Sequence, residues 1–297
     1  IKATPQLANV HCESCHGPGS KHIEWAQSPD KKTDSKKGWD IQLTSGSLQL
    51  WQHQTETTKA KRTEPGNLVQ VERCAQCHSR RSRIHTGNNE QFFMDAFLPS
   101  LLDESLYYPD GQIQDEVYEY GSFLQSKMAD KGVTCSNCHN PHSGKTKIQG
   151  NGLCLQCHNS NLDSPQHTMH QPSTKGSYCV DCHMPTTNYM TVDARRDHSM
   201  RIPRPDLSER LGTPNACNSC HADKSSQWAT EQIDKQKSIN WKVPHYGETL
   251  ASARLAQPSS YNALIELIND AQQPAIVRAT AINLLVNFPT RDYQANL

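Results

Sequence analysis

The chain has 297 residues, and its 30 Lys and Arg residues balance its 30 Asp and Glu residues. The zero net charge gives no reason to expect a nucleic acid or an anionic membrane surface as a partner, and no apolar run is long enough to span a bilayer. Only 34% of the residues are hydrophobic, so we expect disulfides, metals or cofactors to complete the core.

All twelve cysteines belong to one repeated motif, Cys-x-x-Cys-His. Its six copies are Cys12, Cys15 and His16; Cys74, Cys77 and His78; Cys135, Cys138 and His139; Cys154, Cys157 and His158; Cys179, Cys182 and His183; and Cys217, Cys220 and His221. This spacing attaches c-type haem, because two thioethers hold the vinyl groups and the following imidazole binds the iron. The sequence therefore predicts six haems c.

Other uses of paired cysteines explain the pattern less well. A zinc site combines two Cys-x-x-Cys pairs and gives no reason for a histidine after every pair. A redox dithiol normally occurs once in a chain, and a disulfide framework is indifferent to the residue that follows. Haem is attached outside the cytoplasm, so we expect a periplasmic or extracellular location in a bacterium.

Nine histidines remain after the six motif histidines are assigned, and they are the candidates for the second axial position of each iron. They are His11, His22, His53, His85, His142, His167, His170, His198 and His245. Two imidazoles give a low-potential haem without an open coordination position, which suits electron transfer. Ordinary packing accounts for some of the nine.

In chain order, the first candidates flank the first motif. His11 directly precedes Cys12 and can reach an adjacent haem, and His22 follows a Gly-Pro-Gly turn that directs a short helix, 21–27, away from the first haem. Residues 31–62 are polar, and we expect them to be exposed and partly irregular. Residues 115–130 show a helical apolar pattern.

Further candidates accompany the later motifs. His142 follows His139 too closely to reach the far side of the same haem, so we expect it to bind a neighbouring iron. His167 and His170 precede the fifth motif, and of the two we favour His170. His198 lies in an extended stretch between the fifth and sixth motifs. The nearby arginines 195, 196, 201 and 204, like 80, 81 and 83, can pair with haem propionates.

The composition changes near residue 247. The rest of the chain has no Cys or His, and its Leu, Ile, Val and Ala recur at three-and-four spacing between prolines. We expect two or three short helices of a HEAT-like repeat, clearest in "PAIVRATAINLL". The fold class is therefore predicted as mainly α with much irregular loop. We expect residues 1–246 to form a hexahaem cytochrome domain and 247–297 to form a helical-repeat segment, which is either truncated or docked on the haem domain.

The chain resembles bacterial multihaem c-type cytochromes that end in helical repeats. The matching stretches include "CESCHGPGSKH", "YYPDGQIQDEVYEYGSFLQSKM", "GVTCSNCHNPHS", "YCVDCHMPTTNYMTVDARRDHSMRIPRPDLS" and "PHYGETL". Haem packing in such proteins is similar to that of pentahaem nitrite reductase and octahaem cytochromes. The resemblance implies that the distal ligands are His22, His142, His198, His245 and one of His167 and His170.

Two departures from this resemblance bear on function. Members usually have further haem motifs before "CESCHGPGS", so we expect this chain to begin late. The Cys-x-x-Cys-Lys motif of the nitrite reductases is absent. The leading hypothesis is extracytoplasmic electron transfer to redox partner proteins or extracellular acceptors. The alternatives are a nitrite or hydroxylamine reductase-like enzyme with one five-coordinate haem, and a filament in which His11 or His53 binds a haem of the next subunit.

Overall fold

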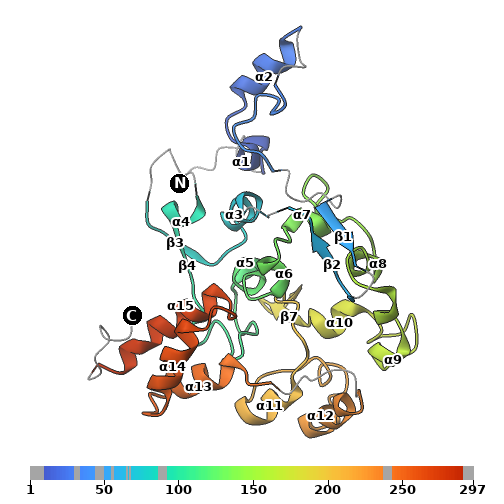
Figure 1. The fold of residues 1–297 in the computed structure, drawn as a ribbon, viewed down its shortest axis with the longest axis vertical. Coiled ribbons are helices and arrows are strands. Elements are labelled where there is room, and N and C mark those ends of the chain that lie inside the picture. The colour runs from blue at the N-terminus through green and yellow to red at the C-terminus, as the bar shows by residue number, and fades with distance from the viewer. Residues whose placement is uncertain are drawn as a thin grey trace.

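The computed structural model describes residues 10–29, 34–43, 50–54, 57–64, 66, 68–85, 92–236 and 243–289. The chain is mainly helical, and short helices alternate with long irregular connections (Figure 1). None of the helices in these ranges is long and apolar enough to cross a membrane. The mainly helical class with irregular loops that the sequence predicts is confirmed.

Most of the helices are one or two turns long. They are α1 Cys12–His16, α2 Ser20–Gln27, α3 Val69–Ala75, α4 Phe93–Ala96, α5 Tyr118–Phe123, α6 Lys127–Asp130, α7 Cys135–Cys138, α8 Gly152–Leu155, α9 Pro165–Thr168, α10 Cys179–His183, α11 Pro205–Leu211, α12 Ser226–Asp234, α13 Tyr246–Arg254, α14 Ser260–Asn269 and α15 Ala275–Leu284, with 3-10 helices η4 Ser160–Leu162 and η5 Leu285–Asn287. Helices this short are not stable alone, so tertiary contacts must hold them.

In the part of the chain that the structure describes, the strands form four two-stranded antiparallel ribbons. These are β1 Trp51–His53 with β2 Ala60–Arg62, β3 Arg81–Arg83 with β4 Phe97–Pro99, β5 His139–Asn140 with β6 Lys145–Thr146, and β7 Thr186–Tyr189 with β8 Asp193–Arg196. In the last ribbon Thr186 pairs with Arg196 and Tyr189 with Asp193. Strands β3, β5 and β7 begin at or just after a motif histidine. The β1–β2 ribbon reaches the fourth motif, because the Ala60 amide donates to the Cys157 carbonyl over 2.6 Å.

One hydrophobic core joins the C-terminal helices to the middle of the chain. Helices α13, α14 and α15 bury Leu250, Leu264 and Val277 completely, and these residues share a cluster with Leu102 and Tyr107. Hydrogen bonds cross the same boundary, because the Leu102 amide donates to the Thr280 hydroxyl over 3.0 Å. The three helices therefore pack on the rest of the protein (Figure 1).

A second, smaller core lies beside the second motif. Phe93, Phe97, Tyr120 and Phe123 pack with Val71 of helix α3, and the Phe93 and Tyr120 rings meet edge to face at 5.1 Å. This aromatic cluster connects helices α3, α4 and α5. It packs α3, which carries Cys74 near its end, against α5.

The structure refines several expectations from the sequence. The expected helix at 21–27 is part of α2, which projects from the body together with α1 (Figure 1). The helical pattern at 115–130 forms two helices, α5 and α6, because the Ser126 hydroxyl caps α6 by accepting a hydrogen bond from the Ala129 amide. Residues 31–62 contain the β1–β2 ribbon, and parts of that stretch lie outside the described residues.

Candidate haem sites

Each motif folds into a tight turn that gathers its two thiols and its histidine. Helices α1 and α10 span the first and fifth motifs. In the second, fourth and sixth motifs the histidine amide donates to the carbonyl of the first cysteine, at 2.8, 3.0 and 2.9 Å. In the third, the His139 amide donates to the Cys135 carbonyl. All twelve thiols are free, and none of the described residues form a cluster of three or more potential metal ligands.

The thiols of successive motifs are neighbours in the order of the sequence. Hydrogen bonds join Cys74 to Cys135 and Cys154 to Cys179. Cys15 lies within electrostatic range of Cys74, Cys138 of Cys157 and Cys182 of Cys217. The six motifs therefore form a continuous series from the first to the last. Groups attached to these thiols would be adjacent to one another in the same order.

Four of the six motif histidines face a histidine outside the motifs. The ring centroids are 6.2 Å apart for His16 and His142, 6.2 Å for His139 and His198, 6.1 Å for His183 and His167, and 6.1 Å for His221 and His170. Two imidazoles on opposite sides of one metal, each bonded at about 2 Å, place their centroids roughly 6 Å apart. The same spacing recurs in all four pairs.

Hydrogen bonds at Nδ1 show which histidines offer a free Nε2. His22, His170, His183 and His198 place Nδ1 2.7 to 2.9 Å from the backbone carbonyls of Lys37, Thr168, Arg201 and Arg196. A carbonyl can only accept, so Nδ1 carries the proton and the Nε2 lone pair is available to a metal. An oxygen partner at the other ring nitrogen is typical of metal-binding histidines.

His245 has the opposite arrangement, and its predicted role as a ligand gains no support. It is the N-cap of α13, where Nδ1 accepts a 3.1 Å hydrogen bond from the Gly247 amide. Burial, and then the charges of Arg201 and Arg204, lower its pKa to about 3. The ring is therefore neutral with its proton on Nε2, which is the atom that an iron would need.

Two motif histidines, His78 and His158, have no facing imidazole, although all fifteen histidines lie in the described part of the chain. His53 of β1 is within electrostatic range of His158, but its Nε2 lies 3.0 Å from the Gln156 carbonyl and so donates to it. His11 is exposed, and no ring contact joins it to another described histidine. His22 stacks on Trp39 at 4.2 Å in the projecting segment.

His78 differs from the other motif histidines at Nδ1 as well. Its partner is the carboxylate of Glu119, at 3.1 Å. Burial lowers the pKa of His78, but the hydrogen bond and charge of Glu119 outweigh burial and raise it. Burial likewise raises the pKa of Glu119, which the contact with His78 lowers overall. No sequence pattern predicts this contact, because 41 residues separate His78 from Glu119.

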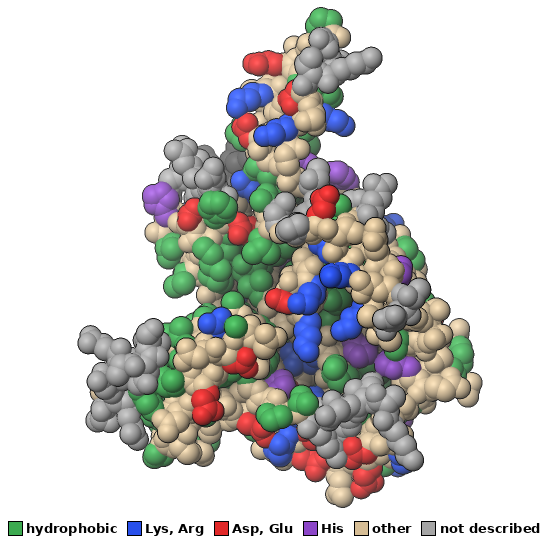
Figure 2. All heavy atoms as spheres, viewed as in Figure 1, with side chains coloured by type: hydrophobic (Ala, Val, Ile, Leu, Met, Phe, Trp, Pro, Cys, Tyr) green, Lys and Arg blue, Asp and Glu red, His purple; other side chains and the backbone are tan. Residues whose placement is uncertain are grey.

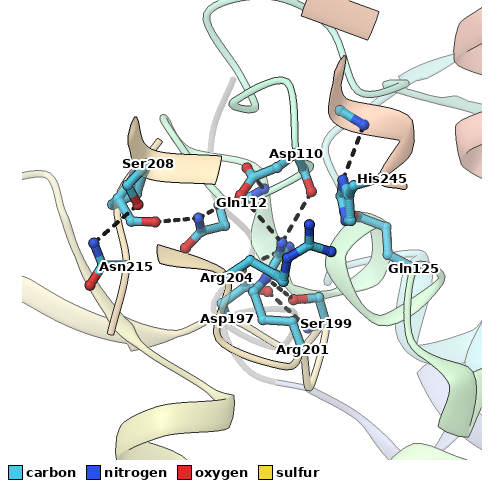
Figure 3. A network of polar contacts seen from close by, with 12 residues as sticks. Asp110, Gln112, Gln125, Asp197, Ser199, Arg201, Arg204, Ser208, Asn215 and His245 are labelled. Atoms are coloured by element: carbon cyan, nitrogen blue, oxygen red, sulfur yellow. Dashed lines mark hydrogen bonds and ion pairs between the residues drawn. The ribbon is translucent and has the colours of Figure 1, made fainter. Parts of the chain in front are cut away.

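The arginines between the fifth and sixth motifs, which could pair with haem propionates, already have carboxylate partners within the chain. Arg195 pairs with Asp193 at 2.8 Å, Arg204 with Asp206 at 2.7 Å, and the buried Arg201 lies between Asp110 and Asp197. Figure 3 shows the Arg201 network, which links the segment around Asp110 to the stretch after β8. Basic side chains, Lys or Arg, still gather with His in the middle of one face (Figure 2).

These features fit covalently bound haem. The four imidazole pairs would each hold an iron between two rings, and the Nδ1–carbonyl bonds leave Nε2 available in His170, His183 and His198. The paired thiols would form the thioether bonds. A haem bound in this way would exchange single electrons, at a potential set by its axial ligands and their hydrogen bonds.

Comparisons with known proteins agree with this geometry. Residues 165–272 match the family model of cytochrome c552, and residues 127–162 match the model of a doubled CXXCH motif. Among solved structures, the outer cell wall cytochrome OcwA is similar with a TM-score of 0.51 and 18% identity, over 95% of this chain and 69% of that chain. The likeness to OcwA concerns the fold. No curated protein sequence matches significantly.

Proposed function

We propose that this multihaem c-type cytochrome transfers electrons one at a time along six haems c outside the cytoplasm. The observation that carries the proposal is the set of four imidazole pairs with one recurring separation. An iron held by two imidazoles has no open position, so it exchanges electrons and binds no substrate. The proximity of successive thiols, from Cys15 to Cys217, supports passage from haem to haem in motif order.

The proposal assigns the axial ligands by these pairs. His142 binds the haem of His16, His198 that of His139, His167 that of His183, and His170 that of His221. The sequence left open which of His167 and His170 is a ligand, and the proposal uses both, on neighbouring haems. We further propose that residues 1–246 carry the haems and that 247–297 form a helical-repeat segment docked on them. A filament stays a prediction from the sequence, which electron microscopy of the purified protein tests.

Counting electrons tests the proposal directly. Dithionite-reduced protein, freed of excess reductant, is titrated with ferric citrate while the haem absorbance is followed. We expect six electrons per chain and midpoint potentials in the low range of bis-imidazole haems. A count below six in protein that carries six haems, or potentials typical of methionine ligation, would contradict the assignment.

A second candidate function rests on the haems of His78 and His158, which no described imidazole faces. If one of these two distal positions is open, that haem can bind a nitrogen oxyanion or hydroxylamine and receive electrons from the other five. Carbon monoxide discriminates between the two functions, because it binds reduced haem only at an open position. A carbon monoxide difference spectrum worth one haem in six favours the enzyme. A spectrum that carbon monoxide does not change supports electron transfer as the function and contradicts the enzyme.

A further inference from the structure

The hydrogen bond between His78 and Glu119 is held in place by the backbone around it. The Tyr120 amide donates to the His78 carbonyl over 3.0 Å, and the Arg80 amide donates to the Val117 carbonyl over 3.2 Å. These two bonds tie the start of α5 to the residues just after the second motif. The Glu119 carboxylate is thereby fixed 3.1 Å from the Nδ1 atom of His78.

Glu119 places a negative charge at the Nδ1 atom of His78, whereas the Nδ1 atoms of other candidate ligands bond to neutral carbonyls. The Nδ1 atoms of His170, His183 and His198 all donate to backbone carbonyls. Arg195, the cation in electrostatic range of both His78 and Glu119, pairs with Asp193 at 2.8 Å. The nearby positive charge is therefore balanced by its own partner, and the charge of Glu119 remains to act on His78.

A negative charge on the hydrogen-bond partner makes an imidazole a stronger electron donor to its metal. The oxidised iron carries one more positive charge than the reduced iron, so a stronger donor stabilises the oxidised form. We propose that Glu119 acts through His78 to lower the reduction potential of the haem bound at Cys74 and Cys77, relative to the haems whose ligands donate to carbonyls. Glu119 is thus a positioning and tuning residue that touches the ligand and not the iron.

The place of this haem in the series gives the tuning a consequence. The Cys74 thiol contacts that of Cys135, and the thiols of Cys74 and Cys77 are within electrostatic range of Cys15. The second haem therefore stands between the first haem and the four that follow. A lower reduction potential makes the second haem the hardest of the series to reduce. It therefore acts as a barrier between an electron on the first haem and the electrons held by the four later haems.

Glu119→Gln tests the inference, which rests on the haem placement of the proposed function. The amide keeps an oxygen that accepts from Nδ1 and removes only the charge. A hydrogen bond to a charged acceptor is roughly twice as strong as a neutral one, and the Glu119 side chain is 30% exposed, so solvent reduces the difference. We expect the reduced-to-oxidised ratio of one haem to rise about tenfold at a given potential, or about 59 mV for one electron.

Spectroelectrochemical titration of the parent and variant proteins provides the measurement, and haem content is first verified as six by pyridine haemochrome. One sixth of the absorbance change should move to higher potential in Glu119→Gln. Glu116→Gln is the control, because it removes the same charge three residues away. Arg80 contacts the backbone carbonyl of Glu116 and not its carboxylate, so the Glu116→Gln titration should match the parent. Glu119→Asp retains the charge and should stay closer to the parent than Glu119→Gln.

Three results would overturn the inference: a Glu119→Gln titration that coincides with the parent, an equal shift in both glutamine variants, or a shift spread evenly over all haems. If Glu119→Gln fails to mature, Glu119→Ala removes the same charge and the contact with His78, and a Glu119→Ala titration that coincides with the parent overturns the inference equally. A haem content below six in the parent would contradict the proposed function instead, so the two failures are distinguishable.

Discussion

Replacing His198 by alanine should open one iron to external ligands, because the His198 and His139 ring centroids lie 6.2 Å apart. The rest of the site should survive the change. The substitution removes one side chain hydrogen bond, from Nδ1 to the Arg196 carbonyl at 2.9 Å, which is worth about 1 kcal/mol. The haem itself stays attached through the Cys135 and Cys138 thioethers. Reduced His198→Ala should therefore bind one more carbon monoxide per chain than the parent protein.

The assay is a carbon monoxide titration of the dithionite-reduced proteins, followed in the Soret region and normalised to haem content. The expected gain is one sixth of the haem, whatever the parent protein itself binds. His85→Ala is the matched control, since His85 is exposed and no ring contact joins it to a described histidine. A His198→Ala amplitude equal to that of the parent, or a gain of the same size in His85→Ala, would refute the ligand assignment.

Three further predictions follow from the same structure. His167→Ala and His170→Ala should each open one haem and the double variant two in the same titration; a double variant that opens only one would mean that one of them is not a ligand. Leu264→Ala, at a fully buried position of α14, should lower the free energy of unfolding by about 2–5 kcal/mol in urea denaturation, and a loss below about 1 kcal/mol would contradict the packing of α13–α15. Burial raises the pKa of Asp206, but Arg204 and Arg210 outweigh burial and lower it overall. Ionised Asp206 therefore stabilises the folded state at pH values above its ordinary pKa of about 4. This stabilisation is lost as the pH falls further. Asp206→Asn should therefore cost about 1.5–3 kcal/mol at pH 7 and less at pH 3, whereas an equal loss at both pH values would exclude an ionic role.

The haem attachment chemistry could be predicted from the sequence because it is local. Five consecutive residues supply two thiols and an imidazole, and their spacing sets which atoms meet. The helices after residue 247 were also predictable, since a three-and-four apolar period reports which face of a helix is buried. In the structure this stretch contains most of α13 and the whole of α14 and α15.

The second axial ligands could not be assigned by the same means. Which imidazole faces a given iron depends on how distant loops pack. His16 faces His142, for example, although the second and third motifs lie between them in the sequence. The spacing before the fifth motif could not separate His167 from His170, because each faces a different motif histidine. The resemblance pointed to His245, whose Nδ1 caps a helix, a role that only the local backbone reveals.

The most direct test of the account is the iron positions in a crystal of the haem-loaded protein, located by anomalous diffraction at the iron absorption edge. The account predicts six iron peaks in motif order, four of which lie between the ring pairs His16 and His142, His139 and His198, His183 and His167, and His221 and His170. Fewer than six peaks, or an iron at any of these four motifs whose second ligand is another residue, would contradict it.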